Sequence, residues 1–249
     1  MSKITFLGTA SAVPNASHHN AHFVLESNQR MILVDCSGNP IARFDEAGID
    51  PLELTDVILT HFHPDHVSGL PLLLMDLWLL GRKQPLTIHG LRDDLKRVQE
   101  MMALYQWETW TEFFPMVFHE LASEENTSVL AEEDITILAS PVCHMIPAIG
   151  LRIVLPEGVV SYSTDTGPCE SVIRLARDAN VLIHEASGST VGHTSAAEAG
   201  EAAARAGVET LVLIHYPPEA DRVALAAEAG KAFSGTVVVA EDLMALELS

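Results

Sequence analysis

The feature that most constrains this chain is the hexapeptide His61-Phe62-His63-Pro64-Asp65-His66, which places four metal-binding side chains within six residues. In extended backbone, residues two apart point to the same side, so His61 and His63 are placed to bind one ion together. Pro64 favours a turn, after which Asp65 and His66 face a second position. Imidazole and carboxylate donors favour zinc, manganese or iron over calcium or magnesium. The hexapeptide therefore predicts a metal site at the end of a strand.

Other polar residues also follow apolar, β-rich runs, at the positions where a rigid sheet presents side chains to a shared cleft. They are Asp35, His144, Asp165 and His215, and His193 lies in an expected loop. Taken alone, His144 is either a ligand or a buried histidine, and His193 either handles protons or simply precedes a helix cap. Glu185 ends another run and either holds a histidine by a hydrogen bond or is solvated.

The order of apolar runs predicts two sheets with helices outside them, because strands with short turns fill the first half and strands alternate with helices in the second. We expect strands at Ile4–Leu7, His22–Leu25, Met31–Val34, Val57–Thr60, Leu86–His89, Met116–Phe118, Ile135–Ala139, Ile149–Leu155, Val159–Ser163, Val181–His184, Leu211–His215 and Val237–Val239. We expect helices at Leu70–Leu80, Leu91–Leu104, Cys169–Asp178, Ser195–Ala206 and Glu219–Phe233. No linker or composition shift divides the chain, so residues 1–249 are expected to form a single domain.

Composition excludes several classes of protein. The formal net charge of −20 opposes non-specific binding to nucleic acid or to an anionic membrane. The most apolar run, Leu70–Leu80, is too short to span a bilayer and reads as a helix buried in the core or in a dimer contact. Three cysteines with no close cluster favour a reduced, cytoplasmic setting. Five basic residues between Arg82 and Arg97 are interspersed with acidic ones, which favours a solvated helix face over a binding patch.

The segment Thr60-His61-Phe62-His63-Pro64-Asp65-His66-Val67-Ser68-Gly69-Leu70 resembles the HxHxDH signature of the metallo-β-lactamase superfamily. Further segments are similar to its ribonuclease Z-like branch: Phe6–Pro14, Leu33–Ser37, Pro85–Gly90, Tyr162–Thr166, His184–Ser187, Gly192–Ala196 and Leu213–Tyr216. The similarity runs in order from Lys3 to about Pro218. It implies an α/β (α+β) fold, the four-layer αββα sandwich of that superfamily.

The resemblance also implies a set of roles for residues of this chain. It gives one ion to His61, His63 and His144, a second ion to Asp65, His66 and His215, and makes Asp165 a bridge between them. Two such ions, most readily zinc with manganese or iron as alternatives, would share the charge that develops during hydrolysis. His193 corresponds to the proton-handling histidine, and Asp65 would also orient the attacking water. Asp35 and Glu185 would hold ligands or the catalytic histidine in place, and a homodimer is expected.

Two departures from the ribonuclease Z pattern bear on the substrate. The arm by which the bacterial enzymes grasp transfer RNA has no room here, since His144 and Asp165 are only 21 positions apart. The basic residues expected after Pro14 are replaced by Asn15-Ala16-Ser17-His18-His19-Asn20. We therefore expect a dinuclear hydrolase that acts on a small phosphodiester, with nucleic acid an unlikely partner.

Three alternatives remain open: a transfer-RNA 3′-processing endoribonuclease, a hydrolase of lactones, thioesters or sulfate esters, and a non-enzymatic metal-binding scaffold. A lid over the cleft is expected from the irregular segment Tyr105–Asn126, and Trp107 and Phe113 would make the pocket apolar.

Overall fold

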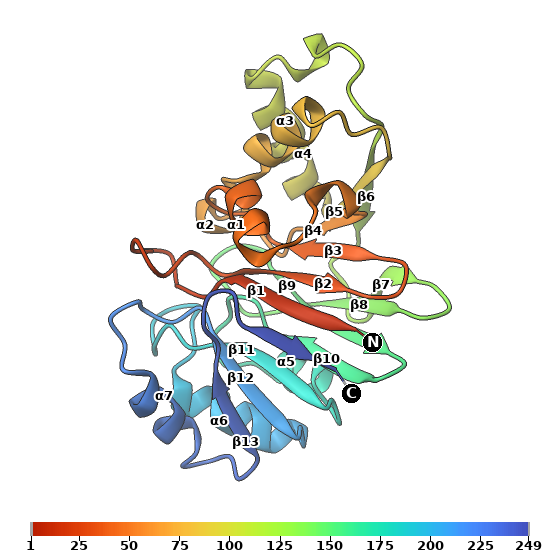
Figure 1. Ribbon diagram of the computed structural model, residues 1–249. Helices are drawn as coiled ribbons and strands as arrows, with labels where there is room; N and C mark the ends of the chain where they lie inside the picture. The colour runs from red at the N-terminus through yellow and green to blue at the C-terminus, as the bar shows by residue number, and fades with distance from the viewer. Residues whose placement is uncertain (1, 249) are drawn as a thin grey trace.

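Two seven-stranded sheets lie face to face between two groups of helices in the computed structural model, which describes residues 2–248 (Figure 1). The first sheet has the order β14 (Ala245–Glu247), β1 (Lys3–Gly8), β2 (His22–Glu26), β3 (Met31–Val34), β4 (Asp56–Ile58), β5 (Leu86–Leu91) and β6 (Met116–Leu121). The second has the order β13 (Thr236–Val239), β12 (Thr210–Ile214), β11 (Val181–Glu185), β10 (Gly158–Tyr162), β9 (Ile149–Leu155), β8 (Thr136–Pro141) and β7 (Thr127–Ala131).

The helices cover the outer face of each sheet, which confirms the expected four-layer αββα sandwich. The first sheet carries α1 (Pro40–Ala47), α2 (Pro64–Val67), α3 (Leu70–Leu79) and α4 (Arg92–Leu104), with a 3₁₀ turn at Pro51–Glu53 and another at Trp107–Thr109. The second sheet carries α5 (Glu170–Leu175), α6 (Ala196–Ala206) and α7 (Arg222–Ala229).

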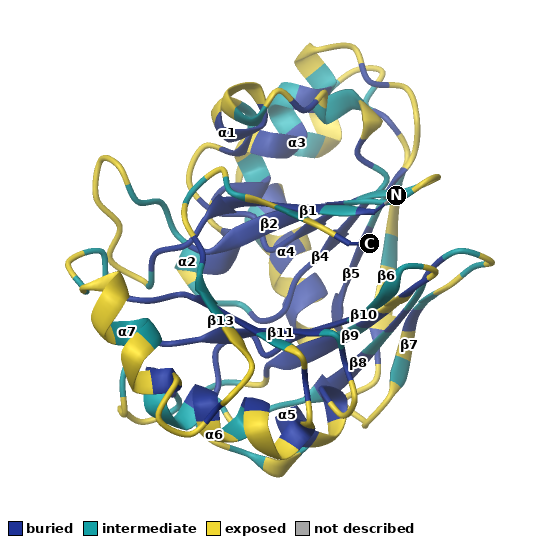
Figure 2. Ribbon diagram, turned by 60° about the horizontal axis from the view of Figure 1, so that its bottom comes forward, coloured by how far each residue is buried: buried dark blue, intermediate teal, exposed yellow. Residues whose placement is uncertain are grey.

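Strand alternation explains why the core has three parts, since successive side chains point to opposite faces of a sheet. In β3, Ile32 and Val34 join the central core between the sheets, whereas Leu33 joins the core beneath α1, α3 and α4. Phe23 and Tyr162 meet across the central core, with ring centroids 5.1 Å apart. Figure 2 shows buried residues along both sheets and exposed residues along the outer sides of the helices.

Parallel strands position the polar side chains that the sequence places at strand ends. Strands β3, β4, β5 and β6 run parallel to one another, as do β10, β11, β12 and β13. The carboxyl ends of parallel strands share one edge of a sheet, which is where open α/β sheets bind ligands. The residues that follow β4, β10 and β12 therefore emerge at such edges.

Arg82 does not belong to a solvated face, and this part of the expectation for the basic cluster was wrong. Its buried guanidinium donates hydrogen bonds to the carbonyl oxygens of Gln84, Leu52, Leu54 and Pro85 at 2.6–3.0 Å. The remaining basic residues are exposed and paired with acidic ones, as expected: Lys83 with Glu112, Arg92 with Glu120, Lys96 with Glu100 and Arg97 with Asp94.

The expected lid at Tyr105–Asn126 is not found in that form. The residues from Met116 to Leu121 form β6, and the preceding segment lies beyond α3 and α4 at the top of Figure 1, away from α2. Because β6 begins at Met116 and runs parallel to β5, this segment reaches the sheet at its amino edge, opposite the carboxyl ends of the strands. Trp107 and Phe113 pack instead against the core beneath the first group of helices, and Trp110 stacks on Trp78 at 5.1 Å.

Candidate metal centre

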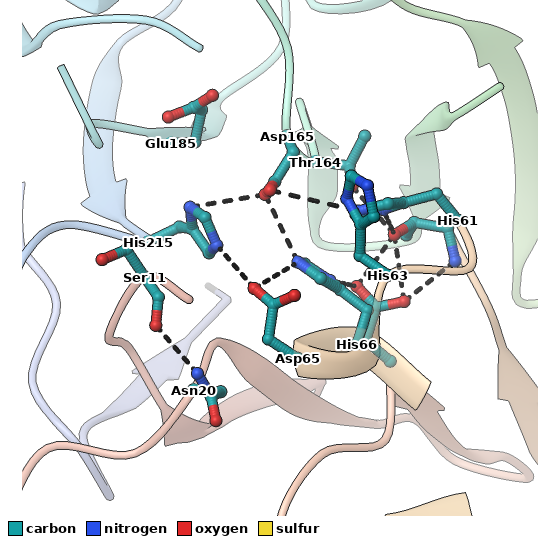
Figure 3. Close-up of polar contacts among 12 residues, drawn as sticks. Ser11, Asn20, His61, His63, Asp65, His66, Thr164, Asp165, Glu185 and His215 are labelled. Carbon is teal, nitrogen blue, oxygen red and sulfur yellow. Dashed lines mark hydrogen bonds and ion pairs between the residues drawn. The ribbon is translucent and has the colours of Figure 1, made fainter. Parts of the chain in front are cut away.

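Four connecting loops and α2 bring the expected metal ligands together (Figure 3). His61 and His63 lie between β4 and α2, while Asp65 and His66 lie in α2 itself. His144 lies in the β8–β9 loop, Asp165 follows β10 and His215 follows β12. Three residues at these strand ends have left-handed backbone: Asp35 at φ 60°, Thr164 at φ 52° and His215 at φ 51°. This conformation costs roughly 1–3 kcal/mol for a residue other than glycine, and it clusters at functional sites.

A first group of ring nitrogens converges from His61, His63 and His144. His63 Nδ1 lies 3.1 Å from His61 Nε2 and 3.0 Å from His144 Nε2. Burial lowers the pKa of His61 well below its usual value, and neighbouring His66 lowers it further. Burial and then His144 likewise lower the pKa of His63. Neutral imidazoles at this spacing are suited to share one cation, because each offers a lone pair toward the same point.

A second group consists of Asp65, His66, Asp165 and His215. His66 Nε2 lies 3.5 Å from Asp65 Oδ2 and 3.5 Å from Asp165 Oδ1. His215 Nε2 lies 3.5 Å from Asp65 Oδ2. The other oxygen of Asp165, Oδ2, lies 4.0 Å from His61 Nε2, so this carboxylate faces both groups.

The donor set fits divalent metal ions. His66 Nε2 and Asp165 Oδ1 are buried, and neither has a hydrogen-bond partner among the described residues. Such orphaned atoms are costly unless a ligand satisfies them. Burial raises the pKa of Asp165, but His215 and His66 outweigh it and hold the pKa well below its usual value. A buried carboxylate ringed by imidazoles matches zinc, manganese or iron chemistry.

Hydrogen bonds around the cluster fix which ring nitrogen of each histidine faces inward. His144 Nδ1 donates to the carbonyl of Gly192 at 2.8 Å, which leaves Nε2 for an ion. Ser187 Oγ donates to the His215 carbonyl at 2.8 Å and therefore accepts from His215 Nδ1 at 2.7 Å. His215 Nε2 is then free to face Asp65.

Asp35 positions expected metal ligands through hydrogen bonds, as the sequence suggests. Its fully buried carboxylate accepts from His66 Nδ1 at 2.8 Å and from the amide of Thr60 at 2.9 Å. The hydroxyl of Thr60 also binds Asp35 and accepts a hydrogen bond from Thr164 Oγ1 at 2.8 Å. The positions of Thr60, Thr164 and Ser187 were not predicted. The sequence signal for them is that each lies within a segment that resembles the family motifs.

His193 is held beside the cluster by Glu185. Its Nδ1 lies 2.9 Å from Glu185 Oε1, and its ring centroid lies 5.1 Å from that of His144 and 5.9 Å from that of His215. The hydrogen bond that His193 donates to Glu185 raises the pKa of His193 against the lowering effect of burial. Glu185 is itself fully buried and also accepts from the amides of Thr166 and Ser187. Glu185 is therefore not solvated, which was the alternative that the sequence left open.

The histidines that the sequence does not place at the metal site make other contacts. His18 bonds Thr9 at 2.7 Å, His22 contacts the carbonyl of Asn20 at 2.8 Å, and His89 contacts Asp56 at 2.8 Å and His119 at 2.9 Å. Within the described residues, none of these belongs to a group of side chains spaced to hold a metal ion. No helix of residues 2–248 has both the length and the apolar character to cross a membrane.

Comparison with known proteins assigns the chain to a family. The family model described as the anti-Pycsar protein Apyc1 matches residues 2–235. A protein named ribonuclease Z from Methanothermobacter thermautotrophicus is 30% identical over an alignment of 304 positions, which covers 100% of this chain and 97% of that protein.

Solved structures agree with this assignment. The human short-form tRNase Z has a TM-score of 0.82 at 25% identity, with 99% of both chains covered. The metallo-β-lactamase fold protein YhfI of Bacillus subtilis has a TM-score of 0.85 at 24% identity, with 98% of both chains covered. The chain therefore belongs to the Apyc1 family within the ribonuclease Z-like branch of the metallo-β-lactamase superfamily, and it is a metal-dependent hydrolase.

Proposed function

We propose that this chain hydrolyses a phosphodiester bond with two divalent metal ions, most readily zinc. One ion is assigned to His61, His63 and His144, the other to Asp65, His66 and His215, and Asp165 is assigned to both. When bound, the pair would act as Lewis acids toward the phosphoryl oxygens and lower the pKa of water. The support is the convergence of these donor atoms, all within 4.8 Å of one another in each group.

The observation that carries the phosphodiester assignment is the Glu185–His193 pair beside the two ligand groups. Cleavage of a phosphodiester releases an alkoxide, which needs a proton. Since Glu185 raises the pKa of His193, the imidazolium persists to higher pH than in a free histidine and can act as the donor. Asp65 takes the complementary role. Burial raises its pKa, but hydrogen bonding from His215 outweighs this, so the carboxylate stays ionised and accepts a hydrogen bond from the attacking water.

For the substrate, the comparisons favour transfer-RNA 3′ processing over the small phosphodiester expected from the sequence. The support is the relative named ribonuclease Z, which aligns with the whole of this chain, together with the human short-form tRNase Z. Nucleic acid is therefore a stronger candidate partner than the net charge suggests. We take ribonuclease activity as the first candidate.

Hydrolysis of a small phosphodiester is the second candidate, and three observations favour it. The alignment with the ribonuclease Z spans 304 positions against the 249 residues of this chain, so that protein has about 55 positions without a counterpart here. Between His144 and Asp165 the chain forms only β9 and β10, which leaves no arm at that place. The net charge of −20 also disfavours phosphate contacts.

A substrate panel separates these candidates. Protein loaded with zinc or manganese is incubated with a precursor transfer RNA, with 2′,3′- and 3′,5′-cyclic nucleotides, with bis(p-nitrophenyl) phosphate and with acyl lactones. A ribonuclease cleaves the RNA at its 3′ trailer with strong salt dependence, whereas a small-molecule phosphodiesterase hydrolyses the nucleotides and leaves RNA intact. Lactone turnover without phosphodiester turnover would refute the proposal, and so would metal binding without any turnover, which is the behaviour of a scaffold.

Three variants test the assigned roles. Asp65→Ala should abolish phosphodiester turnover, while Asp45→Ala, an exposed aspartate on α1, serves as the matched control. His193→Ala should lower kcat by about 10²–10⁴-fold on an alkoxide leaving group. The loss should be much smaller on bis(p-nitrophenyl) phosphate, because p-nitrophenolate leaves without a proton. Equal losses of kcat on both substrates would show that His193 is not the proton donor.

We also propose that two copies of the chain associate through α3. Its inner side is buried as expected, but Leu72, Leu79 and Leu80 are 43%, 66% and 52% exposed. Exposed leucines grouped on one helix are typical of a protein contact. Light scattering on Leu79→Glu should show monomers where the parent is dimeric, and a monomeric parent would exclude the contact.

A further inference from the structure

A cavity of about 520 Å³ lies at the carboxyl ends of β5 and β6. Its walls include Leu91, Asp94, Arg97, Leu121 and Pro147. Because β4, β5 and β6 are parallel, this is the same sheet edge at which β4 leads into His61 and His63. The volume is within the range of small-molecule sites.

Two contacts link the cavity to the metal centre. The Arg97 guanidinium lies 5.8 Å from the ring centroid of Phe62, the residue between the ligands His61 and His63. Pro147, on the opposite wall, belongs to the β8–β9 loop that carries His144. A substrate whose phosphate lies among the ligands therefore has this cavity beside it.

Asp94 is the unusual residue of the cavity. It is 3% exposed, and its Oδ2 has no hydrogen-bond partner among the described residues. Its other oxygen makes only a 3.4 Å contact with Arg97. Burial raises the pKa of Asp94 to about 6, against the lowering effect of Arg97. A buried carboxylate with an unsatisfied oxygen is poorly explained by stability alone and calls for a hydrogen-bond donor.

The remaining residues that line the cavity indicate which kind of molecule supplies the hydrogen-bond donor. Leu91, Leu121, Ala122 and Pro147 present apolar surface. Arg92, at the rim, is already paired with Glu120 at 2.8 Å. The cavity thus combines apolar walls suited to a flat ring with one buried acceptor.

We propose that this cavity binds the base of a nucleotide substrate, with the exocyclic amino group donating to Asp94. Carboxylates accept hydrogen bonds from such amino groups, as they do from the N4 of cytosine. The proposal rests on the proposed phosphodiesterase function, because it places the phosphodiester of the same nucleotide at the metal centre. It applies to a ribonucleotide at the cleavage site of an RNA and to a free cyclic nucleotide alike.

The test compares a substrate that has a base with one that has none. In Asp94→Asn, KM for cytidine 2′,3′-cyclic phosphate should rise by at least about fivefold, which is the lower end of the discrimination that a good bidentate contact to a base provides. KM and kcat for bis(p-nitrophenyl) phosphate should not change. Asp45→Asn, on an exposed residue of α1 that does not line the cavity, is the matched control. The preference for cytidine over uridine substrates should also shrink in Asp94→Asn and persist in Asp45→Asn.

Either of two results would overturn the proposal. Parallel losses on both substrates would make Asp94 a structural residue, and unchanged kinetics on both would leave it without a role in binding. If the parent hydrolyses no phosphodiester, the proposed function fails, but the cavity is still tested by equilibrium dialysis of cytidine monophosphate. Weaker binding to Asp94→Asn than to Asp45→Asn would support the base site, and equal binding would refute it.

Discussion

Replacing Asp35 by asparagine should disable one metal position without unfolding the chain. Asn tolerates the left-handed φ of 60° at this position, and its Oδ1 still accepts from the amide of Thr60. The other end of the side chain changes from a hydrogen-bond acceptor to a donor, because an amide N–H replaces Oδ2, the oxygen that accepts from His66 Nδ1 at 2.8 Å. His66 must then present Nδ1 as an acceptor and carry its proton on Nε2, the nitrogen assigned to the ion.

The size of the effect follows from this forced tautomer. Loss of a carboxylate that orients a metal-binding histidine lowers affinity about 10–100-fold, or roughly 1.4–2.7 kcal/mol. Only the ion assigned to Asp65, His66 and His215 should be affected, so chelator competition should change from two tight sites to one tight and one weak. Asp45→Asn, which is exposed, is the control. Two unchanged sites in Asp35→Asn would refute the role given to this hydrogen bond.

Four further outcomes are expected. Glu185→Gln should move the alkaline limb of the pH–rate profile to lower pH: Glu185 raises the pKa of His193, so the donor form persists above the usual pKa and is lost as pH rises through the raised one. An alkaline limb at unchanged pH would show that the Glu185–His193 pair does not take part in catalysis. Removing metal with a chelator should lower the Tm, since free ion at 100 times its Kd stabilises the folded state by about 2.7 kcal/mol per site. A Tm insensitive to chelation and to added zinc would argue against bound ions. Gly200→Ala should destabilise the fold by about 1–3 kcal/mol despite the better helix propensity of alanine, because the new Cβ would lie 2.3 Å from the Ala229 carbonyl oxygen. Urea unfolding would measure it, and a stabilised variant would contradict the packing of α6 on α7. Arg82→Met should cost at least about 1–3 kcal/mol by the same assay because it leaves buried carbonyls unpaired, and a cost below about 1 kcal/mol would show that water replaces the guanidinium.

Much of the candidate site could be predicted because its signal is local. His61, His63, Asp65 and His66 are adjacent in sequence, and the strand end that presents them is visible as an apolar run. His144, Asp165 and His215 needed the family resemblance, since nothing in their neighbours reveals that three distant loops meet. The partners of Glu185 needed the fold itself: its Oε1 binds residues 8 and 19 positions away.

Three of the features that the sequence did not predict share a physical cause. Strand β14 has only three residues and forms by pairing with β1 at the sheet edge, so no apolar alternation marks it. Strand β7 is partly exposed and also lies at an edge. Arg82 looks like a surface residue in sequence, and its burial depends on carbonyls from Leu52 and Leu54, about 30 positions away. Tertiary contacts, rather than local propensity, decide all three.

The ligands of each assigned ion come from both sheets. His61 and His63 follow a strand of the first sheet, and His144 follows a strand of the second; the other ion likewise joins Asp65 and His66 to His215. Two bound ions would thus work as crosslinks between the layers, with Asp165 shared by both. Separation of the two sheets would require the release of both ions. A chain cut between β6 and β7 would then reassemble from its two fragments in a metal-dependent way, and neither fragment alone would hold an ion tightly.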